Sequence, residues 1–391
     1  MILLGYLCLM NDHEIFRLNS KYLKKAFAPF NPIFGDSSDP YRFLFNVHGI
    51  KKCWIPKAMR KIPLIDSLIK HKSLSAFLRS DFRNQNSLSS SIIFRSLLHW
   101  RLKYDFPFWL YYHFPELCCN LRPLLNFFHE ISLSLLKNKP IRFIIRKNFK
   151  QNFSTILTLF TIWSTLRHDS RNNMMIIAPS TAISHIKSSL ISLSTTPSRS
   201  IGKTLSFLKE GLNLFMPVFN SKIYFSKISN PDGTRGFAFS SLLVSDFGLC
   251  FDSENKPASK IIAAAFPVIP NSVDSVILLE TGPTKKDHFI NKEINHARKG
   301  LSPFSLIELP WFHDSNFIFE FDFPNEKLDL YHKIIKFKNK DKFPGFPFVD
   351  GRYIFSLWRK GVPLEALYWY LTESSFYPSK TKFINRFPPI S

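Results

Sequence analysis

Short apolar runs alternate with longer stretches of helical periodicity through the middle of this chain. Residues 141–145, 174–178 and 276–279 are rich in Ile, Leu, Val, Met and Phe. Such runs are typical of strands that are covered on both faces of a sheet. Helix-start signals follow the first two runs, at Ser154-Thr155 and Ser180-Thr181. Two strand–turn–helix units in succession predict an α/β fold with a mostly parallel sheet and crossover helices.

The same pattern continues toward the C-terminus. Residues 242–244 and 304–309 predict two further strands, and residues 286–299 predict a helix that ends at Gly300. Residues 194–220 are Ser/Thr-rich and then apolar, and we expect them to leave the sheet as an excursion. A final helical segment, broken by a proline, is predicted at residues 353–370.

The chain before residue 139 has a different character. Residues 1–91 contain repeated prolines and a serine tract at 87–91, so we expect a poorly defined arm and linker. Residues 92–138 mix Leu with many aromatic residues and predict two or three short helices. Aromatic side chains can stack on bases, but core packing is favoured here because they are mixed with Leu and Ile. We expect residues 139–391 to form the main domain.

The turn between residues 146 and 155 is a candidate phosphate site. The first N–H groups of a helix lack internal partners, and the helix dipole is positive at that end. A P-loop places Gly, Lys and then Ser/Thr at such a turn. This chain supplies Ser154 and Thr155, but Asn152 and Phe153 stand where the glycine and lysine are expected. Lys147 or Lys150 is then the candidate source of positive charge.

Two other positions carry weaker signals for a phosphate or metal site. Asp246 follows the predicted strand at 242–244, where a carboxylate can reach Mg²⁺, although a strand that simply leaves the core gives the same pattern. Gly202-Lys203-Thr204 is the nearest sequence to a literal P-loop ending. It lacks the upstream glycine and a preceding strand, so we expect no phosphate site there.

Charge and cysteine content narrow the function classes. The formal net charge of +23 favours nucleic acid, an anionic surface or an acidic partner, although 42 Phe against 13 Gly suggests that an AT-rich coding sequence inflates part of the lysine count. The five cysteines form no C-x-x-C pair, so neither a disulfide framework nor a zinc site is expected. No apolar run reaches the roughly 18 residues of a membrane span, and we expect a cytoplasmic protein without a membrane partner.

The order of these features resembles the ATPase half of large terminase subunits, the DNA-packaging motors of tailed phages and prophages. The resemblance covers about residues 106–387. It is carried first by an entry strand and phosphate loop (139–155), a second strand (174–180) and a strand that ends in an acidic residue (236–246). A polar turn (280–283), a Pro-Trp pair (310–311), a Trp-Arg pair (357–359) and a Tyr-Pro-Ser sequence (377–379) follow in the same order. It implies a P-loop NTPase-like fold of the ASCE type, with ATP hydrolysis driving double-stranded DNA into a capsid.

The resemblance also implies roles for individual residues. The nucleotide-binding set is Lys147, Lys150, Asn152, Ser154 and Thr155, with ATP and Mg²⁺ as cofactors. Ser154 and Asp246 would hold the metal, and the catalytic pair would be Asp246 and Thr281, the latter at the position that senses the γ-phosphate.

Implied partners are double-stranded DNA, a portal protein and a small terminase subunit, with the chain in a homo-oligomeric ring in the bacterial host cytoplasm. A C-terminal RNase H-like nuclease domain normally follows in this family. The chain stops at Ser391, where that domain would begin, so no nuclease activity is expected.

Departures from the family pattern leave more than one function open. Besides the changes at Asn152 and Phe153, Ser245-Asp246 replaces an acidic pair and leaves one carboxylate. These changes predict a weakened or lost ATPase. The alternatives are a packaging ATPase and a non-catalytic basic remnant that binds DNA or a partner motor subunit. A basic protein of unrelated fold would be indicated if the strands at 141–145, 174–177, 242–244 and 276–279 did not pair in one parallel sheet.

Overall fold

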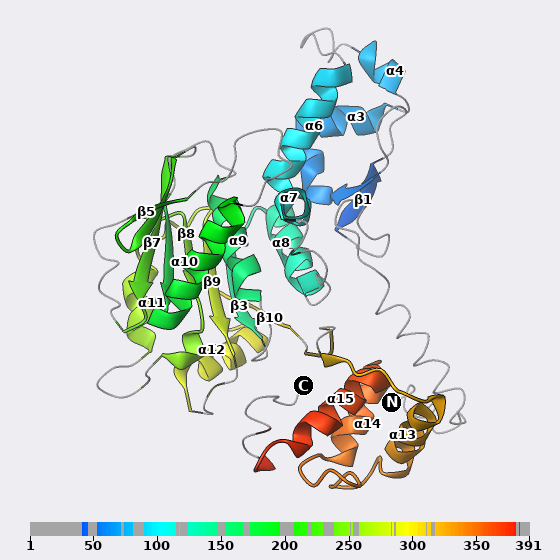
Figure 1. Cartoon of the computed structure of the whole chain (residues 1–391). Coiled ribbons are helices and arrows are strands. Elements are labelled where there is room, and N and C mark those ends of the chain that lie inside the picture. Colours follow the sequence, from blue (N-terminus) through cyan, green and yellow to red (C-terminus); the bar gives the residue numbers. More distant parts are fainter. Residues whose placement is uncertain are drawn as a thin grey trace. The chain divides into compact units, whose positions relative to one another are not determined.

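The computed structural model divides into two compact units, residues 30–309 and a unit containing residues 310–391 (Figure 1). The predicted main domain, 139–391, thus spans the boundary between them. The residues that the structure describes are 41–45, 53–71, 74–80, 90–114, 117, 124–147, 153–166, 173–195, 207–217, 220–229, 238–250, 252, 258–282, 284, 287–309, 311–313, 317–380 and 383.

The first unit is built on an 8-stranded sheet with the order β10-β3-β9-β8-β4-β7-β6-β5. Neighbours from β10 to β7 pair in parallel, and the last two pairings are antiparallel. The strands are β3 (Ile141–Arg146), β4 (Met174–Ala178), β5 (Leu208–Glu210), β6 (Asn213–Met216), β7 (Ser221–Lys227), β8 (Ser241–Val244), β9 (Val276–Thr281) and β10 (Ser305–Glu308).

The predicted α/β fold with a mostly parallel sheet is confirmed. The four apolar runs that define the prediction form the adjacent parallel strands β3, β9, β8 and β4. Strand β9 lies between β3 and β8, so it separates the strand before the candidate phosphate turn from the strand before Asp246. The observation that would indicate an unrelated fold, a lack of pairing among these four strands, is therefore not met.

Helices cover both faces of the sheet, and alternate strand residues explain why. Ile145 points into the core that the sheet shares with α7 (Phe106–His113), α8 (Leu125–Lys137), α9 (Phe153–Leu166) and α10 (Ser180–Thr195). Its neighbour Ile144 points into the opposite core, shared with α11 (Ser259–Ala265) and α12 (Phe289–Arg298). Successive side chains on a strand face opposite ways, so continuous apolar runs serve both cores.

The strands at the β5 edge are not predicted by the sequence pattern. Residues 194–220 are expected to form an excursion, and within them β5 and β6 make an antiparallel extension that joins β7. Strand β7 has polar residues at both ends and alternates buried with partly buried positions over its first five residues, and β5 is exposed along its length. Neither carries the continuous apolar signal of the central strands.

The described residues before α7 form a small body of their own within this unit. It contains β1 (Arg42–Phe45), β2 (Cys53–Pro56), η1 (Lys57–Lys61), α3 (Pro63–Lys70), α4 (Leu74–Leu78) and α6 (Ser90–Tyr104). A separate core of buried apolar residues joins β2, η1, α3, α4 and α6. Pro63 begins α3, where its missing N–H costs nothing, so a proline that obscures the sequence pattern in fact starts a helix.

Residues 310–391 contain a second core of their own. It is aromatic, with Trp311, Trp358 and Phe343 fully buried. The elements are η7 (Trp311–His313), α13 (Pro324–Lys336), α14 (Gly351–Arg359) and α15 (Leu364–Ser375); the last two fall on either side of the predicted break at Pro363. In the part of the chain that the structure describes, no helix combines the length and apolar character needed to span a membrane.

Candidate functional site

The parallel strands β3, β8 and β9 have their carboxyl ends close together on one side of the sheet, and α9 begins beside them. The register pairs Ile145 of β3 with Glu280 of β9, and Val244 of β8 with Leu279 of β9. The residues that follow β3 and β8, Lys147 and Ser245, therefore reach the same edge as Glu280. The backbone N–H of Lys147 continues the ladder by donating to the Thr281 carbonyl over 2.9 Å. Crevices at the carboxyl ends of parallel strands are the usual ligand sites of such sheets.

A compact polar cluster occupies this edge. The ammonium of Lys147 lies 2.7 Å from Ser154 Oγ, 2.7 Å from Glu280 Oε1 and 3.4 Å from Asp246 Oδ1. The Ser154 hydroxyl donates to Glu280 Oε1 over 2.7 Å, and the Ser245 hydroxyl donates to Glu280 Oε2 over 2.6 Å. Both carboxylate oxygens of Glu280 are therefore engaged. The ion pair between Lys147 and Glu280 is thus the point where the chain after β3, the chain after β8, strand β9 and the start of α9 come together.

Burial sets the electrostatics of the cluster. The side chain of Lys147 is 8% exposed and that of Glu280 is 0% exposed, whereas Asp246 is 29% exposed. Burial alone would lower the pKa of Lys147, but attraction and hydrogen bonds from Glu280 and Asp246 outweigh it, and the pKa is raised above 10.5. The ammonium is thus held in its charged form, and Asp246 is the carboxylate that faces solvent.

The turn after β8 brings Asp246 into place. Asp246 has a left-handed backbone, with φ 51° and ψ 43°, a conformation that Asp tolerates better than most residues. The following turn packs closely on β9, since a Cβ on Gly248 would lie 2.7 Å from Thr281 Oγ1. The lack of a side chain at Gly248 therefore lets the Asp246 turn lie against the end of β9.

The predicted site residues fall into three groups. Lys147, Ser154 and Asp246 are brought together as described. Thr281 is fully buried at the same edge, and its hydroxyl donates to the Gly282 carbonyl over 3.0 Å; Thr155 is the third residue of α9. Lys150, Asn152 and the Gly202-Lys203-Thr204 tripeptide lie outside the described residues.

Phe153 explains why no lysine stands at the usual position. It is the first residue of α9, is 5% exposed and belongs to the core shared by the sheet and the helices. The position where a P-loop lysine is expected is therefore occupied by a packing residue. The ammonium that contacts Ser154 belongs to Lys147, which directly follows β3 and lies seven positions before Ser154.

Sequence reasoning misses Glu280 and Ser245 as members of the site. In the sequence Glu280 belongs to the polar turn that follows the apolar run at 276–279. The signal that could find it is the one used for Asp246, an acidic residue at the carboxyl end of a buried strand. The two carboxylates lie on adjacent strands, and the strand order that makes them neighbours appears only in the fold.

No family model matches this sequence. No curated protein matches it either. The structure is similar to two solved phage large terminases. The large terminase of a thermophilic bacteriophage, in complex with ATP-gamma-S, is 10% identical, with a TM-score of 0.33 over 51% of this chain and 45% of that chain. The HK97 bacteriophage large terminase is 11% identical, with a TM-score of 0.37 over 61% of this chain and 49% of that chain. This chain thus spans about half the length of each.

The donor atoms of the cluster suit a hard divalent cation. Carboxylate and hydroxyl oxygens are the ligands that Mg²⁺ takes from proteins, with one or two carboxylates sufficing when phosphates complete the shell. Glu280, Asp246 and Ser154 supply two carboxylates and a hydroxyl. Within the described residues no cluster of three or more His, Cys, Asp and Glu side chains suits a metal ion.

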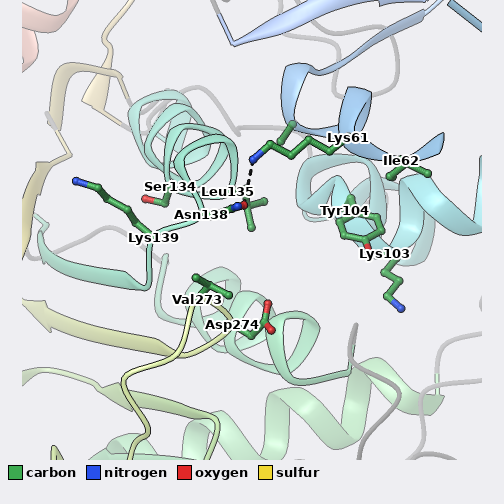
Figure 2. A pocket seen from close by; sticks show the side chains of 11 residues that line it. Lys61, Ile62, Lys103, Tyr104, Ser134, Leu135, Asn138, Lys139, Val273 and Asp274 are labelled. Atoms are coloured by element: carbon green, nitrogen blue, oxygen red, sulfur yellow. Dashed lines mark hydrogen bonds between the residues drawn. The ribbon is translucent and has the colours of Figure 1, made fainter. Parts of the chain in front are cut away.

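A separate cavity lies near the opposite ends of these strands, where β3 and β9 begin. Its volume is about 370 Å³, and its lining includes Lys61, Lys103, Lys139 and Asp274 (Figure 2). Lys139 and Asp274 precede β3 and β9, so the cavity is at the amino ends of the strands. Lys61 reaches across from η1 to the end of α8, donating to the Leu136 carbonyl over 2.8 Å and to Asn138 Oδ1 over 3.1 Å.

Proposed function

We propose that the sheet unit of this chain is the nucleotide-binding domain of a DNA-packaging motor of the large-terminase kind. The observation that carries the proposal is the convergence of Lys147, Ser154, Asp246 and Glu280 beside the start of α9. A cation, a hydroxyl and carboxylates at the carboxyl ends of parallel strands are the groups that phosphoryl transfer needs. The order of sequence features that resembles large terminases supports the choice of motor class.

Each side chain has a separate task in this proposal. Lys147 stabilises the negative charge of the terminal phosphates, replacing the missing lysine of the loop. Ser154 Oγ and Asp246 would hold the Mg²⁺ of a bound nucleotide, and Mg²⁺ would neutralise charge on the phosphate oxygens. Thr281, which lies against the Asp246 turn, would couple that turn to β9. ATP and Mg²⁺ are the cofactors of the proposal. In this proposal the chain also binds a portal protein, a small terminase subunit and further copies of itself in a ring.

A second function, DNA or partner binding without turnover, is favoured by a specific feature of the same site. The ammonium of Lys147 is already engaged by Glu280, Asp246 and Ser154, and Phe153 fills the usual lysine position with an apolar ring. Phosphate binding must therefore replace an existing ion pair. A chain in which Lys147 stays paired with Glu280 and Asp246 would retain the fold but would not hydrolyse ATP.

Nucleotide binding separates the two functions. We expect the purified full chain to bind ATP saturably with Mg²⁺, and Ser154→Ala and Asp246→Ala each to weaken binding by about tenfold or more, since each removes an oxygen facing the metal. Isothermal titration calorimetry measures the binding, and phosphate release in the presence of DNA measures turnover. Thr372→Ala, in the separate C-terminal unit, is the matched control and should bind normally. Absence of ATP binding in the wild type and in every variant would exclude the enzyme and leave the non-catalytic function.

Double-stranded DNA is the proposed partner of the basic cavity. Lys103 and Lys139 line it, and the chain carries a formal charge of +23. Binding to DNA phosphates releases counterions, so we expect Lys103→Glu/Lys139→Glu to weaken DNA binding and to reduce the slope of log K against log salt by about 0.9 for each phosphate that is no longer neutralised. Fluorescence anisotropy across a salt series measures both. Lys209→Glu, on the exposed strand β5, is a charge reversal at the far edge of the sheet. An equal loss per reversed charge in the two variants would show that overall charge, not the cavity, binds DNA.

A further inference from the structure

Glu280 stands at the centre of a cation site that the protein fills with its own ammonium group. Three oxygen atoms surround Lys147 Nζ: Ser154 Oγ at 2.7 Å, Glu280 Oε1 at 2.7 Å and Asp246 Oδ1 at 3.4 Å. The second oxygen of Glu280 is anchored by Ser245, so its carboxylate cannot turn away without losing that hydrogen bond. The oxygens come from three separate elements, α9, β9 and the turn after β8.

The geometry points to an exchange of cations at these oxygens. We infer that Ser154, Asp246 and Glu280 form a divalent-cation site, that Lys147 fills it when no metal is present, and that Glu280 is its principal carboxylate. On entry of a metal–phosphate complex, Lys147 would leave these oxygens for the phosphates, and Ser154, Asp246 and Glu280 would hold the Mg²⁺. The source of the cation, a metal–nucleotide complex, rests on the proposed function; the site itself does not.

Charge balance is the physical reason for the exchange. A carboxylate as deeply buried as Glu280 has to be paired or to coordinate a metal, because leaving its charge uncompensated is costly. Lys147 satisfies that need with a single charge, and Mg²⁺ would satisfy it with two while keeping several of its own waters. Ser245, directly after β8, holds the Glu280 carboxylate of the neighbouring strand β9 by donating its hydroxyl to Glu280 Oε2.

Divalent-cation binding without nucleotide tests the inference directly. Mn²⁺ is the probe, and the electron paramagnetic resonance signal of free Mn²⁺ reports binding to the full chain. Lys147→Met removes the competing cation, and we expect Mn²⁺ affinity to rise by about tenfold or more. Adding Glu280→Gln in the same chain should cancel the gain. Glu308→Gln is the matched control, because Glu308 ends β10 and pairs with Arg146 and Arg298 outside the cluster; in the Lys147→Met background it should leave the gain intact.

The outcomes separate cation exchange from a purely structural ion pair. Equal Mn²⁺ affinity in the wild type and Lys147→Met would overturn the exchange, and a gain that survives Glu280→Gln would remove Glu280 from the site. Lys147→Gln keeps a hydrogen-bond donor without the charge, and serves as the second variant if Lys147→Met does not fold. ATP binding is measured separately. A chain that binds no ATP but gains Mn²⁺ affinity on loss of Lys147 would keep the cation site and refute the proposed motor.

Discussion

Replacing Asp105 with alanine is expected to lower the free energy of unfolding by about 3–5 kcal/mol, because it removes a buried carboxylate that pairs with two buried guanidinium groups. Asp105 Oδ1 lies 2.9 Å from Arg42 Nη2, and Oδ2 lies 3.1 Å from Arg101 Nη2, with all three side chains at most 6% exposed. The same carboxylate accepts from the Phe108 N–H and caps α7. One side chain therefore joins β1, α6 and α7.

Chemical denaturation followed by circular dichroism measures this loss. Asp105→Asn keeps an acceptor for the Phe108 N–H but removes the charge, so we expect a cost below that of alanine. Asp66→Ala is the matched control, since Asp66 pairs with Lys70 one helical turn away at 2.7 Å with side chains 36% and 71% exposed. Exposed pairs contribute about 0–1 kcal/mol. If both alanine variants cost the same, burial of the Asp105 pairs contributes nothing measurable.

The central sheet could be predicted because its strands are buried on both faces. Met174, Leu243 and Leu278 lie in unbroken apolar runs, and such runs need no knowledge of neighbours to be recognised. The edge strands could not be predicted this way, since Lys222 and Tyr224 lie on the partly exposed side of β7 and interrupt its apolar pattern. Prolines obscure the helices of the N-terminal part for a different reason. Pro63 and Pro107 lie in first turns of helices, where a proline is tolerated.

Only part of the candidate site could be predicted, because some of its residues are marked by the sequence next to them and others only by which strands pair in the fold. Ser154 is marked by its helix start, and Asp246 by the strand before it. Lys147 is one of two alternatives in the sequence, because a loop charge is placed by the fold and not by its position in the chain. Glu280 depends on which strands are neighbours, and it meets Ser154, 126 positions earlier in the chain, only after β3 and β9 have paired.

The Lys147–Glu280 pair should reveal whether the site is kept for stability or for function. Lys147→Met alone leaves the buried Glu280 carboxylate without its ammonium, and we expect a loss of about 3–5 kcal/mol in the free energy of unfolding. Glu280→Gln alone should cost less, since Asp246 still faces the ammonium. Removing both charges should recover most of the loss, because two neutral side chains need no compensation. Asp66→Asn/Lys70→Met, at the exposed pair, should show little coupling.

The pKa of Lys147 determines the pH at which the denaturation should be measured. This pKa is raised above 10.5 by Glu280 and Asp246 against the effect of burial, so the contribution of the lysine charge is present at neutral pH and is lost as the pH rises through the higher folded-state value. Denaturation at neutral pH therefore captures all of it. We expect the double variant to be nearly as stable as the wild type, to bind no ATP, and to bind Mn²⁺ no more tightly than the wild type does. A double variant as unstable as Lys147→Met would instead assign the pair to the fold. Recovery of stability without recovery of binding would mean that the charges are retained for the ligand, since neutral side chains would hold β3 and β9 together equally well.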